Sequence, residues 1–454
     1  MKNNNVIGDE FILDIKRLGI NGEGIGFYNK KAVFVDNAIP GEGVNVKVIE
    51  STDKMLKAKV LEYKNKSENR INPICPKYGS CGGCNTMHIK YEYMLKLKKD
   101  ILVEAITRYT KLNPKSFEIS DTVPSKEFNY RNRSQLGLRS DDDKVSLCMT
   151  MANSNIQVSI DDCYVQDKVI NKINNDICKL IEDNNISIYS YKENKGILRY
   201  VTIRVNKKGD ALVDLVLFDD DKIVDILASK ILKIDNVKGV YKSINKSLKS
   251  GSEIVGDNLT LLCGKEYIVE EVGKIKYMIY PDTFFQLNTI QAEKMAEIVL
   301  KKAKLSFKER VLDAYSGIGF LGLYLAHNSK EVVGIEYNNN SVKLANMNAK
   351  MNKINNAKFY QGDSSELLKK MIDDGDTFDV IVVDPPRTGL DQKFMNSLIK
   401  ANAKRIIYVS CNPATLAKNL DFLSQYYNVN SITPLDFFPN TALVESVVSL
   451  VLKK

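Results

Sequence analysis

A cysteine near the C-terminus occupies a position that suits a nucleophile. The almost wholly apolar run Arg405–Val409 leads into Ser410, Cys411 and Asn412. Such a run is typical of a strand buried on both faces of a parallel sheet. Ligands of these sheets bind beyond the carboxyl ends of the strands. A cysteine at a strand end is most often a small buried hydrophobic residue, but beside a ligand the nucleophile becomes the better interpretation.

A glycine-rich turn follows an earlier apolar run. Arg310–Ala314 leads into Gly317, Gly319 and Gly322, which match G-x-G-x-x-G and open a helical pattern. Glycines at this point let the backbone turn sharply and approach a ligand at a helix N-terminus. Glu336 ends the next apolar run, at a spacing where a carboxylate accepts hydrogen bonds from ribose hydroxyls. This segment alone leaves a nicotinamide dinucleotide, S-adenosylmethionine and a tight turn without a ligand open.

A third apolar run ends in two prolines between charged residues. Val380–Val383 is followed by Asp384, Pro385, Pro386 and Arg387. The prolines fix the backbone where the sheet would bind its ligand. An oxidoreductase that uses a dinucleotide leaves this motif and Cys411 unexplained, so the combination favours S-adenosylmethionine.

Three cysteines lie close together in a loop rich in proline and glycine. Cys75, Cys81 and Cys84 have the spacing C-x5-C-x2-C, and Cys163 follows two aspartates further on. Four thiolates hold either zinc or an iron–sulfur cluster. The gap between Cys75 and Cys81 is looser than zinc sites usually show, but spacing alone leaves both metals open.

The length and composition of the chain limit the kind of protein that positions these residues. It has 454 residues, which corresponds to two to four domains. Its hydrophobic content of 44% and charged content of 27% exclude a mostly disordered protein. No apolar run reaches the roughly 18 residues that span a membrane, and the N-terminus lacks the apolar core of a secretory signal. We therefore expect a cytoplasmic protein without membrane contact, in which eight cysteines favour metal binding or catalysis over disulfides.

The N-terminal part, residues 1–62, is predicted to be a small antiparallel barrel. Turn signals such as Asn21-Gly22 and Pro40-Gly41 separate five strand-like runs. These runs are Phe11–Leu18, Gly24–Tyr28, Lys31–Val35, Gly43–Glu50 and Leu56–Tyr63. Five short strands in so short a segment suit an OB-like fold, which often binds nucleic acid.

Two further domains are predicted. Residues 63–280 combine the cysteine loop with a helix over Tyr91–Thr110 and a mixed α+β region that contains a helix near Lys168–Glu182 and an Asn-Tyr-Arg-Asn-Arg run. Residues 281–454 alternate apolar strands with amphipathic helices, the pattern of a Rossmann-like α/β domain with a parallel sheet.

The positive charge of the chain is concentrated around the cysteine loop. The net charge is +9, and residues 63–120 hold eleven basic but only five acidic side chains. Lys96, Lys98 and Lys99 lie mainly off the apolar face of the predicted helix. A solvated basic face and a surface that contacts phosphates explain this excess equally well.

Together these segments closely resemble the RNA uracil-C5 methyltransferases, which make 5-methyluridine in ribosomal or transfer RNA. The likeness covers nearly the whole chain, and its N-terminal part resembles a TRAM domain. It rests on the motifs Thr283–Asn288, Asp313–Gly319, Asp384–Arg387, Ser410–Leu416 and Phe438–Glu445.

The resemblance implies a role for each of these residues. Those implied to contact S-adenosylmethionine are Gln286, Tyr315, Glu336 and Asp384. Cys411 corresponds to the nucleophile that adds to C6 of the uracil, and Glu445 to the base. The implied ligands of a 4Fe–4S cluster are Cys75, Cys81, Cys84 and Cys163. Ser316 and Leu443 depart from the family, which usually has Cys and His at these positions.

The resemblance also implies the partner. Because both a barrel and a cysteine cluster are present, 23S ribosomal RNA is favoured, with a single-stranded or flipped uridine as the target. We expect a monomer. Transfer RNA is the alternative substrate, and Leu443 motivates a further alternative, a non-catalytic RNA-binding paralogue.

Overall fold

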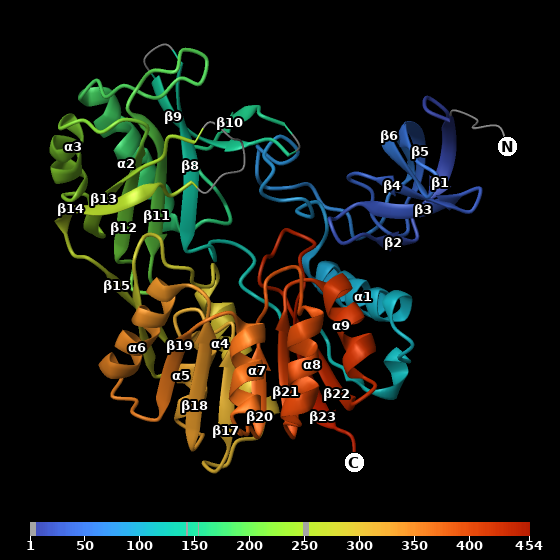
Figure 1. The fold of residues 1–454 in the computed structure, drawn as a ribbon. Coiled ribbons are helices and arrows are strands. Elements are labelled where there is room, and N and C mark those ends of the chain that lie inside the picture. The colour runs from blue at the N-terminus through green and yellow to red at the C-terminus, as the bar shows by residue number, and fades with distance from the viewer. Residues whose placement is uncertain (1–5, 142–143, 153, 248–253) are drawn as a thin grey trace. The chain divides into compact units, whose positions relative to one another are not determined.

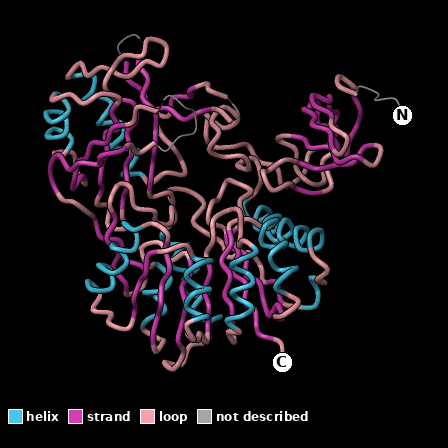
Figure 2. Tube along the Cα trace, viewed as in Figure 1, coloured by secondary structure: helices cyan, strands magenta, loops and turns pink. Residues whose placement is uncertain are grey.

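The computed structural model describes residues 6–141, 144–152, 154–247 and 254–454. The chain divides into two compact units, drawn in Figure 1 and coloured by secondary structure in Figure 2. The first unit comprises Met1–Ser125, Pro385–Leu390 and Tyr408–Lys454, and the second comprises Lys126–Asp384 and Asp391–Ile407. No helix of the described ranges has both the length and the apolar character needed to cross a membrane.

The N-terminal barrel of the first unit is a six-stranded sheet of order β1-β5-β6-β4-β3-β2 (Figure 1). Its strands are β1 (Glu10–Asp14), β2 (Arg17–Leu18), β3 (Gly24–Tyr28), β4 (Lys31–Val35), β5 (Gly43–Ser51) and β6 (Met55–Asn65). Alternate side chains of these strands form an apolar core that includes Val33, Val35, Val44, Val46 and Leu56.

Two features of this barrel differ from the prediction. The run expected as one strand over Phe11–Leu18 is broken, because Ile15 N donates to Glu42 O whereas Lys16 N donates to Ile25 O. The chain thereby changes its partner from β5 to β3. The expectation of a wholly antiparallel barrel is also wrong, because β4 and β6 pair in parallel.

The rest of the first unit consists of the C-terminal strands and the helices beside them. It contains α1 (Tyr91–Tyr109), η1 (Pro114–Ser116), β7 (Glu118–Ile119), α9 (Pro413–Leu423), β22 (Tyr427–Leu435), β23 (Glu445–Leu452) and the last three residues of β21 (Arg405–Ser410). The strand order is β21-β23-β22-β7. Because β22 and β23 are antiparallel, the expectation of a purely parallel C-terminal sheet is wrong for these two strands.

The second unit begins with the predicted central α+β region. Its seven-stranded sheet has the order β10-β9-β8-β11-β12-β13-β14. The elements are β8 (Arg133–Asp141), β9 (Lys144–Thr150), β10 (Gln157–Ser159), α2 (Lys168–Asp183), β11 (Leu198–Val205), β12 (Ala211–Leu217), α3 (Ile223–Ile231), β13 (Val237–Ile244) and β14 (Asp257–Gly264). Isoleucines at three- and four-residue spacing place one face of α2 in the apolar core of this sheet.

The remainder of the second unit carries the glycine loop. A hairpin of β15 (Ile268–Val272) and β16 (Ile275–Ile279) precedes four parallel strands of order β19-β18-β17-β20. The strands are β17 (Arg310–Ala314), β18 (Glu331–Glu336), β19 (Ala357–Gln361) and β20 (Val380–Val383), and the helices are α4 (Thr289–Ala303), α5 (Phe320–Ala326), α6 (Asn339–Met351), α7 (Ser364–Asp373) and α8 (Gln392–Ala401). The buried runs predicted as parallel strands are confirmed here.

Candidate active site

The glycine loop between β17 and α5 turns through left-handed backbone. Tyr315, Gly317 and Gly319 have φ angles of 64°, 54° and 81°. Ser316 N donates to Ile335 O at 3.0 Å, which ties the loop to β18. A Cβ atom added at Gly317 would have no heavy atom within 4 Å. The backbone is therefore open at Gly317, as a ligand that approaches the loop requires.

Glu336 fixes this loop from the end of β18. Its Oε2 accepts a hydrogen bond from Gly317 N at 3.0 Å, and its Oε1 accepts one from Asn338 N at 2.8 Å. Each carboxylate oxygen can accept a further bond. Glu336 can therefore hold the loop and still accept from a ribose hydroxyl.

Asp313 is a buried acid beneath the loop. It is 1% exposed, and its Oδ2 accepts from Gly322 N at 2.8 Å in the first turn of α5. Burial, with smaller contributions from the carboxylates of Asp384 and Glu336, raises the pKa of Asp313 to about 7, although the hydrogen bond from Gly322 N opposes this shift. Burial also raises the pKa of Asp384, which follows β20. The sequence indicated Asp313 only as the start of a motif, because its partner is a backbone amide.

The segment that carries Gln286 is clamped by Asn132, which directly precedes β8, and by Arg204 of β11. Asn132 Nδ2 donates to Gln286 O and to Thr289 Oγ1, both at 2.9 Å. Arg204 Nη1 donates to Asn132 Oδ1 at 3.1 Å, and Arg204 Nη2 donates to Thr283 O at 3.0 Å. Asn132 belongs to the Asn-Tyr-Arg-Asn-Arg run, to which the sequence assigned no role.

A cavity of about 780 Å³ borders the same region of the second unit. Its lining includes Phe284, Ile318 and Asn338, which are close neighbours in sequence of Gln286, Gly317 and Glu336. The four residues predicted to contact S-adenosylmethionine do not themselves line it. This cavity therefore lies beside the predicted cofactor residues rather than at them.

Cys411 lies between β21 and α9 in the first unit, and it is partly exposed. Asn412 caps α9, because its Oδ1 accepts from Ala414 N at 3.0 Å and from Thr415 N at 3.4 Å. Pro413, the first residue of α9, suits this position because it lacks the amide hydrogen that would have no helical partner. The N-terminus of a helix favours negative charge, so a thiolate at Cys411 is well placed.

Glu445 is the first residue of β23, the neighbour of β21 in this sheet. The loop before it is tied to the cysteine loop. Asn440 O accepts from Asn85 N at 3.0 Å and from Thr86 N at 3.1 Å. Ala442 N donates to Asn85 Oδ1 at 3.2 Å. The residues directly after Cys84 therefore position the loop that leads to Glu445.

Lys98 was expected mainly off the apolar face of its helix, and this expectation is wrong. Its side chain is fully buried and forms an ion pair with Asp436, and its Nζ donates to Phe438 O at 3.2 Å. Burial lowers the pKa of Lys98, while the carboxylates of Asp436 and Glu445 oppose that shift. Helical periodicity could not reveal Lys98, because its partner lies far away in the sequence.

The cysteine loop is folded by short turns. Tyr78 N donates to Cys75 O at 3.1 Å, and Gly83 N donates to Cys81 Sγ at 3.4 Å. Cys163 belongs to the other unit, where its backbone N and O bond the side chain of Asn171. Within the described ranges, no group of three or more His, Cys, Asp or Glu side chains is arranged to hold a metal ion. The described residues thus do not show the predicted cluster.

Comparison with known proteins identifies the family. A family model described as tRNA (uracil-5-)-methyltransferase matches residues 90–454, and a TRAM domain model matches residues 6–61. The chain belongs to the tRNA (uracil-5-)-methyltransferase family. It is therefore an S-adenosylmethionine-dependent RNA uracil-5 methyltransferase with an N-terminal TRAM domain. This membership excludes the dinucleotide oxidoreductase.

Relatives cover almost the whole chain. An RNA methyltransferase of Listeria monocytogenes, itself described as uncharacterized, is 37% identical over 98% of each chain. One from Halalkalibacterium halodurans is 38% identical over 98% of this chain and 96% of its own. Among solved structures, the chain is similar to the Pyrococcus abyssi tRNA (uracil-54, C5)-methyltransferase in complex with S-adenosyl-L-homocysteine, with a sequence identity of 27%. That structure matches with a TM-score of 0.77 over 97% of this chain and 100% of its own.

Proposed function

We propose that this methyltransferase acts on a uridine of 23S ribosomal RNA through a covalent bond between Cys411 and C6 of the base. The observation that carries the mechanism is the placement of Cys411 at the capped N-terminus of α9, directly after β21. Glu445 begins the neighbouring strand β23. A nucleophile directly after β21 and a carboxylate base at the start of β23 thus belong to neighbouring strands of one unit.

The chemistry requires both groups because C5 of uracil is a weak nucleophile. The Cys411 thiolate adds to C6, and the electron pair of the C5–C6 bond moves to C5 and O4. Bound S-adenosylmethionine would supply the methyl group to C5 and would be left as S-adenosylhomocysteine. Glu445 then accepts the C5 proton, the C6–S bond breaks, and the thiolate of Cys411 is released. The target base must leave its stack for this attack on its face.

The cofactor residues in the proposal are Gln286, Tyr315, Glu336 and Asp384. Their support is the left-handed glycine loop, the open backbone at Gly317 and the carboxylate of Glu336 bonded to Gly317 N. Calorimetry should detect binding of S-adenosylhomocysteine and none of NAD. Binding of NAD alone would refute this assignment.

RNA with 5-fluorouridine at the target tests the roles of Cys411 and Glu445. Fluorine replaces the proton that Glu445 must remove, so the methylated adduct should stay attached to Cys411. Cys411→Ala should give neither adduct nor product. Glu445→Gln should form the adduct on unmodified RNA and release it slowly. Normal turnover by Glu445→Gln would show that another group is the base.

Transfer RNA is the second candidate substrate. The Pyrococcus abyssi enzyme, whose name gives transfer RNA as its substrate, aligns with 97% of this chain. This alignment supports transfer RNA, whereas the predicted cysteine cluster together with the barrel supports ribosomal RNA. Mapping of 5-methyluridine in 23S ribosomal RNA and in transfer RNA from a deletion strain separates the two substrates.

The cluster and the domain limits also belong to the proposal. Four thiolates, Cys75, Cys81, Cys84 and Cys163, are the donors that a 4Fe–4S cluster uses. Protein purified without oxygen should carry about four irons per chain, and Cys81→Ala should lose iron and stability together. Stoichiometric zinc without iron would refute the cluster.

We also propose domain limits at residues 1–62, 63–280 and 281–454.

A further inference from the structure

A second cavity lies in the first unit, where β6 is followed by the cysteine loop. Its volume is about 340 Å³. This volume falls at the lower end of the range that small-molecule sites occupy. Residues with aromatic, cationic and amide groups line it, among them Tyr63, Lys66, Arg70, Asn72, Tyr78 and His88. None of these residues has a role in the mechanism above.

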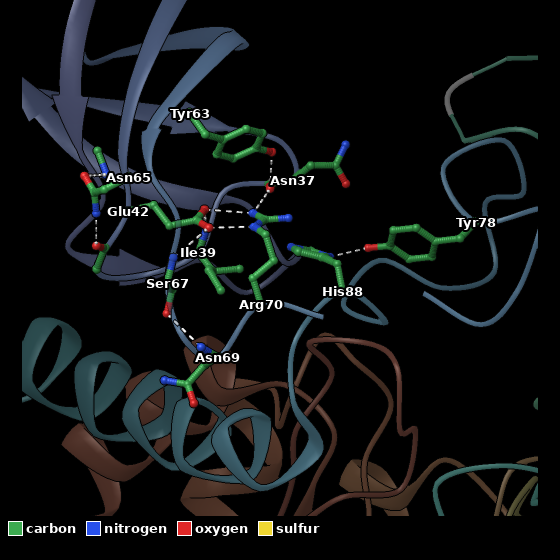
Figure 3. Close-up of polar contacts among 12 residues, drawn as sticks. Asn37, Ile39, Glu42, Tyr63, Asn65, Ser67, Asn69, Arg70, Tyr78 and His88 are labelled. Atoms are coloured by element: carbon green, nitrogen blue, oxygen red, sulfur yellow. Dashed lines mark hydrogen bonds and ion pairs between the residues drawn. The ribbon is translucent and has the colours of Figure 1, made fainter. Parts of the chain in front are cut away.

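One wall of this cavity is a preformed ion pair, drawn in Figure 3. Arg70 Nε donates to Glu42 Oε1 at 2.6 Å, and Arg70 Nη2 donates to Glu42 Oε2 at 2.7 Å and to Asn37 O at 2.6 Å. The Glu42 side chain is fully buried, and Ile39 N also donates to it at 3.0 Å. Among the described residues, no hydrogen bond of Arg70 uses Nη1. The guanidinium is thus rigidly held and keeps one nitrogen free for a ligand.

Aromatic rings flank this guanidinium. The Arg70 guanidinium carbon lies 4.6 Å from the centroid of the Tyr63 ring, and Lys66 Nζ lies 5.6 Å from the same centroid. The exposed Lys66 therefore places a positive charge at the cavity. This combination of ring and cation is typical of surfaces that bind single-stranded nucleic acid.

Tyr78 and His88 form another part of the lining. The Tyr78 hydroxyl and His88 Nδ1 are 2.5 Å apart and share a hydrogen bond. His88 is 3% exposed, and its Nε2 is buried without a hydrogen-bond partner among the residues that the structure describes. A buried polar atom of this kind normally has a partner.

We propose that this cavity binds one unpaired nucleotide of the RNA substrate, away from the uridine that is methylated. Unpaired bases are recognised by stacking on aromatic and guanidinium planes and by hydrogen bonds to their edges. Tyr63, Arg70 and Tyr78 supply the planes, and the exposed amide of Asn72 supplies groups for the edge. Lys66 faces the phosphate. The surrounding residues 63–120 carry the positive excess that an RNA backbone requires. This inference rests on the proposed function, because it assumes an RNA substrate.

The test compares two exposed lysines of the full-length protein. Lys66→Ala removes a residue that lines the cavity, whereas Lys64→Ala removes the same charge from a lysine that pairs with Glu62 and does not line it. The probe is a fluorescein-labelled, unstructured RNA dodecamer of mixed sequence, and binding is measured by fluorescence anisotropy over a range of salt concentrations. Lys66→Ala should weaken binding about fivefold or more and should reduce the salt slope by about one. Lys64→Ala should change affinity less than about twofold.

Crosslinking gives a second measurement. A dodecamer with 4-thiouridine should crosslink to the peptide that contains residues 63–88, and Asn72→Ala should reduce the yield. Equal effects of Lys66→Ala and Lys64→Ala, or crosslinks that all lie outside residues 63–88, would overturn the proposal. Methyl transfer distinguishes the two hypotheses. If the protein transfers no methyl group but the two lysine variants still differ in RNA affinity, only the proposed function is refuted. If the protein transfers methyl groups and its KM for RNA is unchanged by Lys66→Ala and Asn72→Ala, only the cavity proposal is refuted.

Discussion

Replacing Asn132 tests how the central sheet holds the cofactor segment. Asn132→Ala removes the bonds from Nδ2 to Gln286 O and Thr289 Oγ1 and the bond that Oδ1 accepts from Arg204. A buried neutral hydrogen bond contributes about 1 kcal/mol and one with a charged donor about 2 kcal/mol. The expected loss of stability is therefore about 4 kcal/mol. The segment of Gln286 also becomes free to move, and this predicts at least a tenfold weaker binding of S-adenosylhomocysteine, or about 1.4 kcal/mol.

Asn206→Ala is the matched control. Asn206 is similarly buried in the same unit, donates to Val269 O at 2.8 Å, and accepts from Lys208 N and Asp210 N at 3.0 and 2.9 Å. Its loss should lower stability by a similar amount without touching the segment of Gln286. Differential scanning fluorimetry should show a lower Tm for both variants. Calorimetry should show weaker binding of S-adenosylhomocysteine for Asn132→Ala alone.

A third variant separates the two contacts of Asn132. Asn132→Asp keeps an oxygen that accepts from Arg204, but it replaces the donor to Gln286 O with a second oxygen. It should bind S-adenosylhomocysteine as weakly as Asn132→Ala does. The positioning argument is refuted if both Asn132 variants bind S-adenosylhomocysteine as tightly as Asn206→Ala.

Three further predictions concern the buried charges and the glycine loop. Because the pKa of Asp313 is raised in the folded protein, its protonated form stabilises the fold at low pH, and this contribution is lost as the pH rises from about 4 to about 7. The free energy of unfolding of Asp313→Asn, relative to that of wild type, should therefore increase by about 3 kcal/mol between pH 5 and pH 8. Urea unfolding measures this difference, and parallel pH profiles of the two proteins would contradict it. Lys98→Met should lower stability by about 3–5 kcal/mol because Asp436 stays buried without its cation, and Lys98→Met with Asp436→Leu should recover part of the loss in Tm. Gly322→Ala should weaken S-adenosylhomocysteine binding, since its Cβ would lie 2.8 Å from Asp313 Oδ2; unchanged affinity in calorimetry would show that the loop tolerates the shift.

Elements with strong periodicity and clear boundaries were predictable from the sequence. The strands β3, β4, β17 and β20 have the bounds that their apolar runs and flanking turn residues indicated. The helix α2 was predicted to within one residue, because its isoleucines recur with helical spacing. Local sequence decides these elements, since the hydrophobic effect acts on the pattern itself.

Features that depend on distant partners were not predictable. Two such features are the parallel pairing of β4 with β6 and the break after β1. Both depend on which strand is the hydrogen-bonded neighbour, and the periodicity of a sequence does not indicate the neighbour. Lys98 looks like a surface lysine until Asp436, 338 residues away, is placed beside it. The same holds for Asn132 and Gln286, which are 154 residues apart.

The cysteine loop has a positional role that can be argued without any metal. Methyl transfer to C5 moves no electrons to an external acceptor, so the reaction itself gives the loop no redox task. The cysteine loop instead contacts the loop that precedes Glu445. Asn85 and Thr86 form hydrogen bonds with Asn440. Ala442 and Val444 pack in one apolar cluster with residues of α1.

Lys98 of the same helix binds Phe438 O at 3.2 Å, so the loop before Glu445 is held at both its start and its middle. Asn440 adopts a left-handed φ of 66° within it, a conformation that persists only where the surroundings fix it. A general base must be aimed at one proton to be effective. In the proposed mechanism, the cysteine loop and α1 therefore act as positioning elements, because they fix the loop that leads to Glu445.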